Sequence, residues 1–420
     1  MRILLIFLFS VLALAASIHA ASVDAKVLSD LQDSNEVPVI VMLQEGAKIE
    51  DIRVEKEHEF DALNGFSGKI SRRELGELLS EPGVSSVELD APIRLTLSDS
   101  APLTNASLVW PIKLDGINIT GSGETVCVID TGADYNHTGL GSGWGNKVVG
   151  GYDFVNSDTD PYDDHGHGTY TAGIVASSNA TYRGLAPDAK IVAIKALDSN
   201  GDGFESDAIA GINWCVANST TFNISVISMS LSGSTLFSNY CDSAKTSYRN
   251  AVNAAVAKNI SVIASSGNNG NTSAIPAPAC IQNATSVGST TKTDGVSSFS
   301  NRNSITDLLA PGSSITSLVP TGSCLLCSAS GVSTQSGTSA SAPHVSAAFA
   351  LLRQFKKLEN GTLLNPSQIE SALKAAGKNI SDSGLVFQRI NVLRSLFLLD
   401  AIKPSLTVNS PLNQTYNTTN

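Results

Sequence analysis

The stretch Ser336–Val345 reads S-G-T-S-A-S-A-P-H-V, and the rest of the chain is best interpreted from it. Ser339 stands among small residues at the start of a helix expected over residues 339–355. Unpaired backbone N–H groups at such a helix start favour developing negative charge. Pro343 lies one turn into the helix, where its missing N–H costs least. These features predict a nucleophilic serine at a helix N-terminus.

Three polar residues upstream of Ser339 complete a catalytic pattern. They are Asp130 in V-C-V-I-D-T-G, His167 in H-G-T-Y-T-A-G and Asn268 in S-S-G-N-N-G. A serine hydroxyl needs a base to take its proton, and the base needs a partner that fixes its tautomer. Asp130 ends an apolar strand, at the edge where open α/β sheets place ligands. The order predicts a triad of Asp130, His167 and Ser339, with the Asn268 amide and the Ser339 N–H as oxyanion hole.

These four motifs, in this order, resemble those of the subtilisin-like serine peptidases, or subtilases. The resemblance to this family covers the chain from about Glu36 to Ser395. The resemblance implies an α/β fold of the subtilisin-like three-layer type with a mainly parallel central sheet. Ser265-Ser266 and Tyr170-Thr171 depart from the family words, but neither departure removes a catalytic group.

The resemblance also implies where a substrate binds. Ser230, Leu231, Ser232 and Gly233 resemble the edge that pairs with an extended peptide by β-augmentation. Residues 270–279 are expected to line the main specificity pocket, and they include no carboxylate. We therefore expect broad specificity for uncharged residues.

The first 21 residues predict export. Arg2 precedes an apolar run over residues 3–16, and small residues follow around Ala20. This pattern is typical of a secretory signal peptide, and the run is shorter than the ~20 apolar residues of a spanning helix. We expect residues 1–20 to be a signal peptide, the protein to be secreted or at the cell surface, and the mature chain to contain no transmembrane segment.

Residues 21–100 predict a small separate α+β domain. Strands are expected over residues 37–43 and 84–89. A helix between them begins at Ser71, with Glu74 at the spacing of a capping box.

Residues 60–70, F-D-A-L-N-G-F-S-G-K-I, resemble the propeptide signature of subtilases. The resemblance implies a ferredoxin-like domain that acts as chaperone and inhibitor of its own catalytic domain. The polar stretch over residues 96–105 is then a cleavable linker. A purely structural N-terminal domain is the alternative.

Residues 101–401 form the predicted catalytic domain, because short apolar runs alternate there with helical ones, which favours a parallel sheet covered by helices. Expected strands cover residues 125–129, 191–196, 226–229 and 260–264. Expected helices cover residues 168–176, 206–217, 243–257, 339–355 and 366–375. Residues 402–420 are a polar tail that resembles the opening strand of a β-sandwich module, so the chain has a tail here or is a fragment.

The composition limits the partners of the protein. The chain has 420 residues, and 42% of them are hydrophobic, enough for a sizeable core. With 27 basic and 38 acidic residues the formal net charge is −11, which argues against a nucleic-acid partner. The expected partners are protein or peptide substrates and the protein's own propeptide.

Export permits disulfides among the six cysteines. Cys324 and Cys327 form a C-x-x-C for which a loop staple is expected, because no second ligand pair supports a zinc site. Cys241 and Cys280 flank the Asn268 loop and are the second expected pair. We expect Cys127 and Cys215 to be buried free thiols, because free cysteine behaves as a small hydrophobe.

Glycosylation patterns of the type N-x-S/T occur along the chain, and they include Asn105, Asn118, Asn179, Asn271, Asn360 and Asn417. High Asn, Ser and Thr content accounts for many of them. The patterns nevertheless predict a glycoprotein.

Several motifs imitate metal sites. His165-Gly166-His167 suggests a metal, but only His167 precedes the family word, so His165 is expected to be a loop residue. Residues 198–203 imitate the start of an EF-hand, yet the twelfth position is Ile209 instead of Glu. Neither motif predicts a metal site.

An acidic cluster before His167 leaves calcium open, and its members are Asp158, Asp160, Asp163 and Asp164. A solvated loop is the expected structure of this cluster. Gly139 stands where the family commonly places a ligand aspartate, which argues against the best-known calcium site. No cofactor is required in this interpretation, and structural calcium is the minority alternative.

The combined prediction is a secreted serine endopeptidase made as a zymogen. The alternative from another class is a catalytically inactive subtilase scaffold that serves in adhesion or envelope structure. Reaction of Ser339 with a fluorophosphonate probe would distinguish them, because only an activated serine is labelled.

Overall fold

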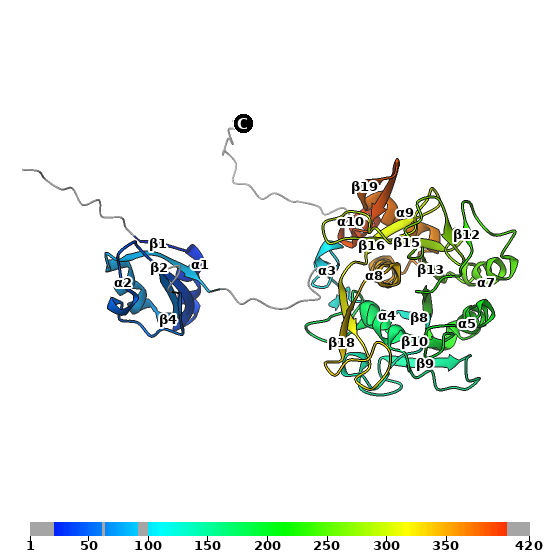
Figure 1. The fold of residues 1–420 in the computed structure, drawn as a ribbon, viewed down its shortest axis with the longest axis horizontal. Helices are drawn as coiled ribbons and strands as arrows, with labels where there is room; N and C mark the ends of the chain where they lie inside the picture. The colour runs from blue at the N-terminus through cyan, green and yellow to red at the C-terminus, as the bar shows by residue number, and fades with distance from the viewer. Residues whose placement is uncertain (1–20, 61–63, 91–99, 401–420) are drawn as a thin grey trace, which may run out of the picture. The chain divides into compact units, whose positions relative to one another are not determined.

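The computed structural model describes residues 21–60, 64–90 and 100–400 (Figure 1). The chain forms two compact units, residues 1–94 and 95–420. The predicted signal peptide and polar tail lie outside the described residues, and so do residues 96–99 of the predicted linker. Among the described helices, none is long and apolar enough to cross a membrane.

The smaller unit is one twisted sheet with helices packed on it. Its strands are β1 (Ser22–Val23), β2 (Glu36–Leu43), β3 (His58–Phe60), β4 (Gly65–Ser71) and β5 (Val84–Leu89), in the order β1-β5-β2-β4-β3. The helices are α1 (Ala25–Asp33), α2 (Arg72–Ser80) and the 3₁₀ turn η1 (Ile49–Asp51). Burial alternates along β2, so one face of the sheet is covered, by apolar residues of α1 and α2.

The start of α2 confirms the predicted capping box. The Ser71 hydroxyl accepts a hydrogen bond from the Glu74 N–H, and the Glu74 carboxylate accepts one from the Ser71 N–H. Two backbone donors that the helix leaves unpaired are thereby satisfied. Strands β2 and β5 also match their predicted positions within a residue.

The larger unit is built on a nine-stranded sheet with the order β19-β20-β16-β15-β13-β11-β8-β10-β9. All neighbouring pairs are parallel except the hairpin β19–β20. The strands are β8 (Thr125–Asp130), β9 (Val148–Asp153), β10 (Lys190–Lys195), β11 (Ile224–Met229), β13 (Ser261–Ser265), β15 (Thr285–Thr290), β16 (Leu308–Pro311), β19 (Lys378–Asp382) and β20 (Leu385–Arg389). The chain runs from β8 to one side of the sheet, through β9 and β10, and then crosses to β11 on the other side.

Two layers of helices enclose this sheet, with α8 running through the middle of the unit in Figure 1. Helices α4 (His167–Ala176) and α8 (Thr338–Asn360) share a core with Val126 and Val128 of β8. Helices α5 (Glu205–Ala217) and α7 (Thr246–Ala257) cover the opposite face, which Cys127 and Ile129 enter. Successive side chains of a strand point to opposite faces, so a sheet buried on both sides needs an unbroken apolar strand. The predicted three-layer fold is confirmed.

Shorter elements complete the larger unit. They are α3 (Ser100–Leu103), β6 (Lys113–Leu114), β7 (Ile117–Asn118), η3 (Thr138–Leu140), α6 (Ser219–Phe222), β12 (Leu236–Phe237), β14 (Ile275–Pro276), β17 (Ile315–Leu318), β18 (Val332–Gln335), α9 (Pro366–Ala376) and α10 (Val392–Leu399). The antiparallel hairpin β17–β18 leads directly into α8 and so into Ser339.

The structure forms three disulfides, and one of them corrects a prediction. Cys241–Cys280 and Cys324–Cys327 are paired as expected. Cys127 and Cys215, predicted to be free thiols, are also paired, with their Cα atoms 6.4 Å apart. Both sulfurs are fully buried because Cys127 points from β8 to the face that α5 covers. The expectation that both cysteines are buried was therefore not enough to tell whether they are free or paired.

Candidate active site

Asp130 and His167 meet at the carboxyl end of the sheet. Asp130 is the last residue of β8, and His167 is the first residue of α4. His167 Nδ1 lies 2.6 Å from Asp130 Oδ1. The Thr131 N–H donates to the same oxygen at 2.8 Å, and Asp130 is completely buried. Since a carboxylate only accepts, Nδ1 carries the proton and Nε2 is left with a free lone pair.

Glycine residues allow β8 and α4 to come this close. A Cβ atom on Gly168 would lie 2.0 Å from the carbonyl oxygen of Gly132. Gly132 itself has φ of +103° and faces the Pro161 carbonyl. Any side chain at position 168 would push His167 away from Asp130.

The environment raises the pKa of His167. Burial alone lowers the pKa of the imidazole, but the Asp130 charge and hydrogen bond, helped by Asp163, outweigh burial and hold the pKa above its ordinary value. A base with a raised pKa accepts a proton more readily, and it works only above that pKa.

Ser339 is the second residue of α8, as predicted. The Ser230 hydroxyl donates to the Ser339 carbonyl, and Ser230 directly follows β11, the parallel neighbour of β8. The nucleophile candidate therefore lies near the same strand ends. A Cβ atom on Gly337 would lie 2.8 Å from Ser339 Oγ and 3.4 Å from Asn268 Nδ2. Ser339 and Asn268 therefore flank one small space that only glycine at 337 leaves open. Among the described residues, no hydrogen bond joins Ser339 Oγ to His167.

The amide of Asn268 is held in one orientation. Its Oδ1 accepts hydrogen bonds from the Thr338 N–H at 2.8 Å and the Thr338 hydroxyl at 2.9 Å. Two donors on one oxygen identify that atom as the carbonyl oxygen, which leaves Nδ2 as the free donor. Thr338 was not among the predicted site residues, because its role depends on a contact with a loop about 70 residues away.

The four predicted substrate-binding residues follow β11. The Ser230 hydroxyl donates to the Ser339 carbonyl at 2.9 Å, and the Gly233 N–H donates to the Ala277 carbonyl at 2.9 Å. Ser230 therefore lies beside the start of α8, and Gly233 lies beside Ala277 of the segment expected to line the specificity pocket. Substrate binding by these residues stays a prediction.

The acidic cluster before His167 is only partly the solvated loop that was expected. Asp158, Asp160 and Asp164 are exposed, but Asp163 is 1% exposed. The prediction is wrong for Asp163 because its carboxylate accepts hydrogen bonds from the turn that leads into α4 and from the Thr131 hydroxyl, which is 32 positions away in the sequence.

His165 is 7% exposed, and its Nδ1 accepts a hydrogen bond from the His167 N–H at 3.3 Å. Within the described ranges, no group of three or more His, Cys, Asp or Glu side chains is arranged to hold a metal ion. Structural calcium stays an untested alternative.

Comparisons with known proteins show which families the two units of the chain match. The family model described as "Subtilase family" matches residues 121–388, and that of "Peptidase inhibitor I9" matches residues 14–96. Alkaline serine exoprotease A of Vibrio alginolyticus is 33% identical over 79% of this chain and 59% of its own length. Thermophilic serine proteinase of Bacillus sp. (strain AK1) is 37% identical over 64% of this chain and 61% of its own length.

Subtilisin E of Bacillus subtilis (strain 168) is 35% identical over 73% of this chain and 76% of its own length. A solved structure described as a cold adapted subtilisin-like serine proteinase matches with a TM-score of 0.53 and 33% identity, over 66% of this chain and 93% of that chain. This chain thus spans about three fifths of the first two relatives, and a larger share of the others.

Proposed function

The chain belongs to the subtilase family, and from this premise we propose that it is a serine endopeptidase made as a zymogen. The observation that supports this most strongly is the 2.6 Å contact of His167 Nδ1 with the buried Asp130, at the strand end near which Ser339 and Asn268 also lie. The smaller unit, matched by an inhibitor family, is the proposed propeptide.

In the proposed mechanism, His167 Nε2 takes the proton of the Ser339 hydroxyl as Oγ attacks the scissile carbonyl carbon. Asp130 keeps the imidazole in the required tautomer and stabilises the imidazolium. The carbonyl oxygen becomes an oxyanion, which accepts hydrogen bonds from Asn268 Nδ2 and the Ser339 N–H. The protonated His167 then gives its proton to the leaving amine, and an acyl-enzyme remains on Ser339.

Water completes the proposed cycle. His167, now neutral, takes a proton from the water that attacks the acyl carbon, and it returns this proton to Ser339 Oγ when the acid product leaves. Asn268 can donate to the oxyanion because its amide is fixed: Thr338 donates two hydrogen bonds to Oδ1, and Nδ2 is left for the oxyanion.

The finer parts of the proposal rest on the sequence. Broad specificity for uncharged residues rests on the absence of carboxylates from residues 270–279. Secretion rests on the pattern of residues 1–20, and glycosylation on the N-x-S/T patterns. The mass of the protein recovered from the culture medium tests both: leader removal and added sugar each change it.

Labelling by a fluorophosphonate probe is the direct test. We expect the probe to label Ser339 in the mature protein and not in Ser339→Ala or His167→Ala. A folded protein that the probe does not label would instead favour the inactive scaffold.

Self-cleavage tests the zymogen. We expect the full chain to cut itself between about Arg94 and Asn105, because a polar segment in this range connects the inhibitor-like unit to the unit that contains the proposed active site. Ser339→Ala should accumulate uncut. If purified Ser339→Ala still matures, cleavage in cis is wrong.

A further inference from the structure

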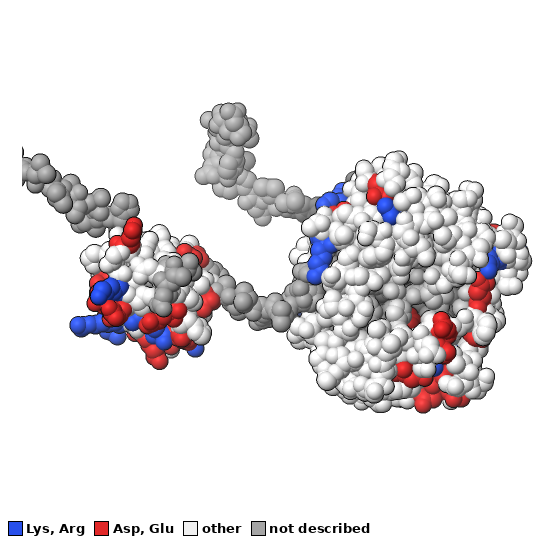
Figure 2. Space-filling view, in the orientation of Figure 1, with Lys and Arg blue, Asp and Glu red and all other residues white. Residues whose placement is uncertain are grey.

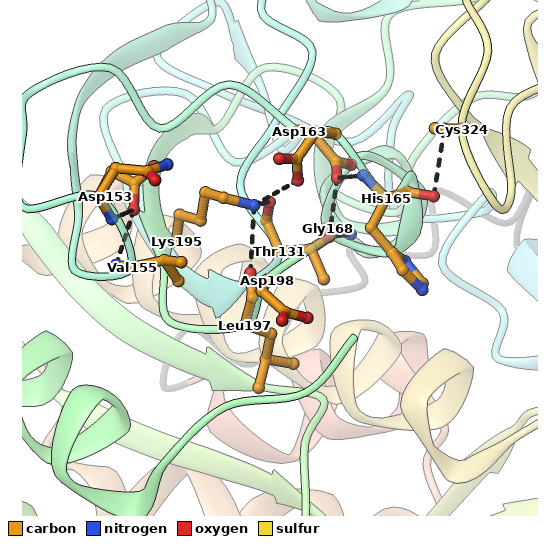
Figure 3. Close-up of polar contacts among 12 residues, drawn as sticks. Thr131, Asp153, Val155, Asp163, His165, Gly168, Lys195, Leu197, Asp198 and Cys324 are labelled. Carbon is orange, nitrogen blue, oxygen red and sulfur yellow. Dashed lines mark hydrogen bonds and ion pairs between the residues drawn. The ribbon is translucent and has the colours of Figure 1, made fainter. Parts of the chain in front are cut away.

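Asp163 is a buried carboxylate that the triad does not use. It accepts five hydrogen bonds, from the Thr131 hydroxyl (2.8 Å), the N–H groups of His165 (3.1 Å), Gly166 (2.7 Å) and Thr169 (2.7 Å), and the Thr169 hydroxyl (2.6 Å). Figure 3 shows its side chain between Thr131 and the turn that contains His165. Five donors around one carboxylate exceed what helix capping alone requires, since a capping side chain usually satisfies one or two.

The five donors lie within or directly beside the two elements that hold the acid and the base. Thr131 directly follows Asp130 at the end of β8, whereas the other donors form the entry and first turn of α4, on either side of His167. The Thr131 hydroxyl also accepts a hydrogen bond from the Gly168 N–H at 2.8 Å. Asp163 and Thr131 therefore connect the strand of Asp130 to the helix of His167 through side chains that touch neither catalytic group.

The neighbouring Asp164 offers a natural contrast. Its side chain is half exposed, and it pairs with Lys195 Nζ at 2.5 Å. Lys195, at the end of β10, donates to the carbonyl oxygens of Thr131 and Leu197. Figure 3 shows this lysine with its amino group close to both Thr131 and Leu197. Asp164 thus carries the same charge one position along, but its side chain is paired with β10 and not with α4.

We propose that Asp163 is a positioning residue for the reaction, which fixes the His167 imidazole against Asp130 through Thr131 and the first turn of α4. This inference rests on the proposed serine peptidase function. It assigns to Asp163 the task of keeping Nε2 in line with Ser339, since a displacement of about 1 Å at such a site costs on the order of a hundredfold in rate.

The charge of Asp163 also affects His167, because it raises the pKa of the imidazole. The groups that face His167 are Asp130 on β8, Asp163 and His165 on the entry loop, and the buried Tyr170 on α4. Burial lowers the pKa of His167, and Asp130 and then Asp163 raise it. Removing the Asp163 charge therefore lowers the pKa of His167, and the acid limb of the rate profile moves to lower pH. Asp164 is not among the groups that set this pKa.

The first experiment compares Asp163→Asn with Asp164→Asn in protein that is expressed as the full chain and then allowed to mature. Asp163→Asn keeps the shape but turns an NH₂ group toward Thr169 or Thr131, so donors meet donors. We expect its kcat to fall about ten- to a hundredfold with little change in KM, and its acid limb to move to lower pH. Asp164→Asn should leave the acid limb where it is.

A second pair guards against a folding defect in Asp163→Asn. Thr131→Val keeps the volume of a fully buried side chain and removes the hydroxyl between Asp163 and Gly168. We expect kcat to fall about tenfold in Thr131→Val and to be recovered in Thr131→Ser, which retains the hydroxyl. Equal kcat in Thr131→Val and Thr131→Ser would contradict the proposed connection.

A measurement without turnover separates this inference from the proposed function. In the Ser339→Ala background, NMR titration follows the His167 ring, assigned by its loss in His167→Ala. We expect the pKa of His167 to be lower with Asp163→Asn and unchanged with Asp164→Asn. An inactive wild-type protein would overturn the proposed function but not this shift. If the pKa is the same in both variants, the positioning role is wrong, even if the protein is an active peptidase.

Discussion

The two units of the molecule are stabilised in different ways. All six cysteines lie in the larger unit, as three disulfides, and the sequence of the smaller unit contains none. The larger unit buries apolar residues on both faces of its sheet, whereas the smaller unit has one apolar cluster on one face. Figure 2 shows charged side chains crowded on the visible face of the smaller unit and sparse on that of the larger one.

This difference matches the two proposed roles, a propeptide that is cleaved off and a peptidase that remains. A small domain with one core and no crosslink has little free energy of unfolding to lose, because the fraction of surface that folding buries is smaller in a shorter chain. Disulfides restrict the unfolded state of the larger unit, which suits a peptidase that we propose to act outside the cell. We therefore expect the same loss in free energy of unfolding to impair folding more in the smaller unit than in the larger one. We expect only substitutions in the larger unit to lower the catalytic rate directly.

The largest expected effect is chemical and lies in the larger unit. His167→Ala removes the acceptor of the Ser339 proton, and kcat should fall by on the order of 10⁶, the scale known for a subtilisin triad. His165→Ala, with no proton to transfer, should cost at most about tenfold. Turnover of an uncharged chromogenic peptide measures both, with the propeptide supplied in trans. Equal loss in the two variants would mean that the triad is wrongly placed.

Phe66→Ala tests the core of the smaller unit. Phe66 of β4 is fully buried, and its truncation should cost about 3–5 kcal/mol, much of what a unit of this size has. In full-chain Ser339→Ala protein, hydrogen exchange should rise across β2 to β5 and stay unchanged in β8 and α8. Unchanged exchange in the smaller unit would contradict its low stability. The yield of mature enzyme should also fall if this unit is the folding aid.

Loss of a disulfide tests the larger unit alone. The double variant Cys241→Ser/Cys280→Ser opens a crosslink between residues 39 positions apart and should lower the free energy of unfolding by about 2–4 kcal/mol. Denaturant unfolding of the Ser339→Ala background measures this loss. A reducing agent, which can open all three disulfides, should lower the free energy of unfolding of the larger unit at least as much and leave hydrogen exchange in residues 64–90 unaffected. A change in that exchange would contradict the contrast between the units.

The smallest expected effects compare two equivalent helix caps. Helix α9 begins with a capping box of Asn365 and Gln368, as α2 does with Ser71 and Glu74. Ser71→Ala and Asn365→Ala should each cost about 1 kcal/mol. Local hydrogen exchange should show the same loss in free energy at both sites, but only Ser71→Ala should reduce the yield of mature enzyme. If Asn365→Ala reduces the yield equally, the smaller unit is not the weaker one.

The cap of α2 also predicts a pH dependence. The hydrogen bonds from the Ser71 side chain and backbone hold the pKa of Glu74 below its ordinary value of 4.5. A lowered pKa means that this stabilisation is present above pH 4.5 and is lost as the pH falls through the folded-state pKa. Glu74→Gln should remove this dependence in the exchange of α2; an unchanged profile would show that the Glu74 charge is not involved.

The sequence by itself determined the features that depend on neighbours along the chain. The apolar run before Asp130 specified a strand buried on both sides, and the small residues around Ser339 specified a helix start. The capping spacing of Ser71 and Glu74 was sufficient to place α2. Such signals are local because hydrogen bonding and side-chain period are set within a few residues. The catalytic assignments themselves remain predictions, which the geometry supports.

Only the tertiary structure decided the features in which distant segments meet. Cys127 looked like an apolar core residue until α5 brought Cys215 to it. Asp163 looked like one acid of a solvated loop, yet it is buried because the end of β8 and the start of α4 surround it with five donors. The free energy of a buried charge depends on all the donors around it. Four of the five lie within six residues of Asp163, but the Thr131 hydroxyl comes from the end of β8, 32 positions away. No local pattern records which carboxylate in a run of acids will be the buried one.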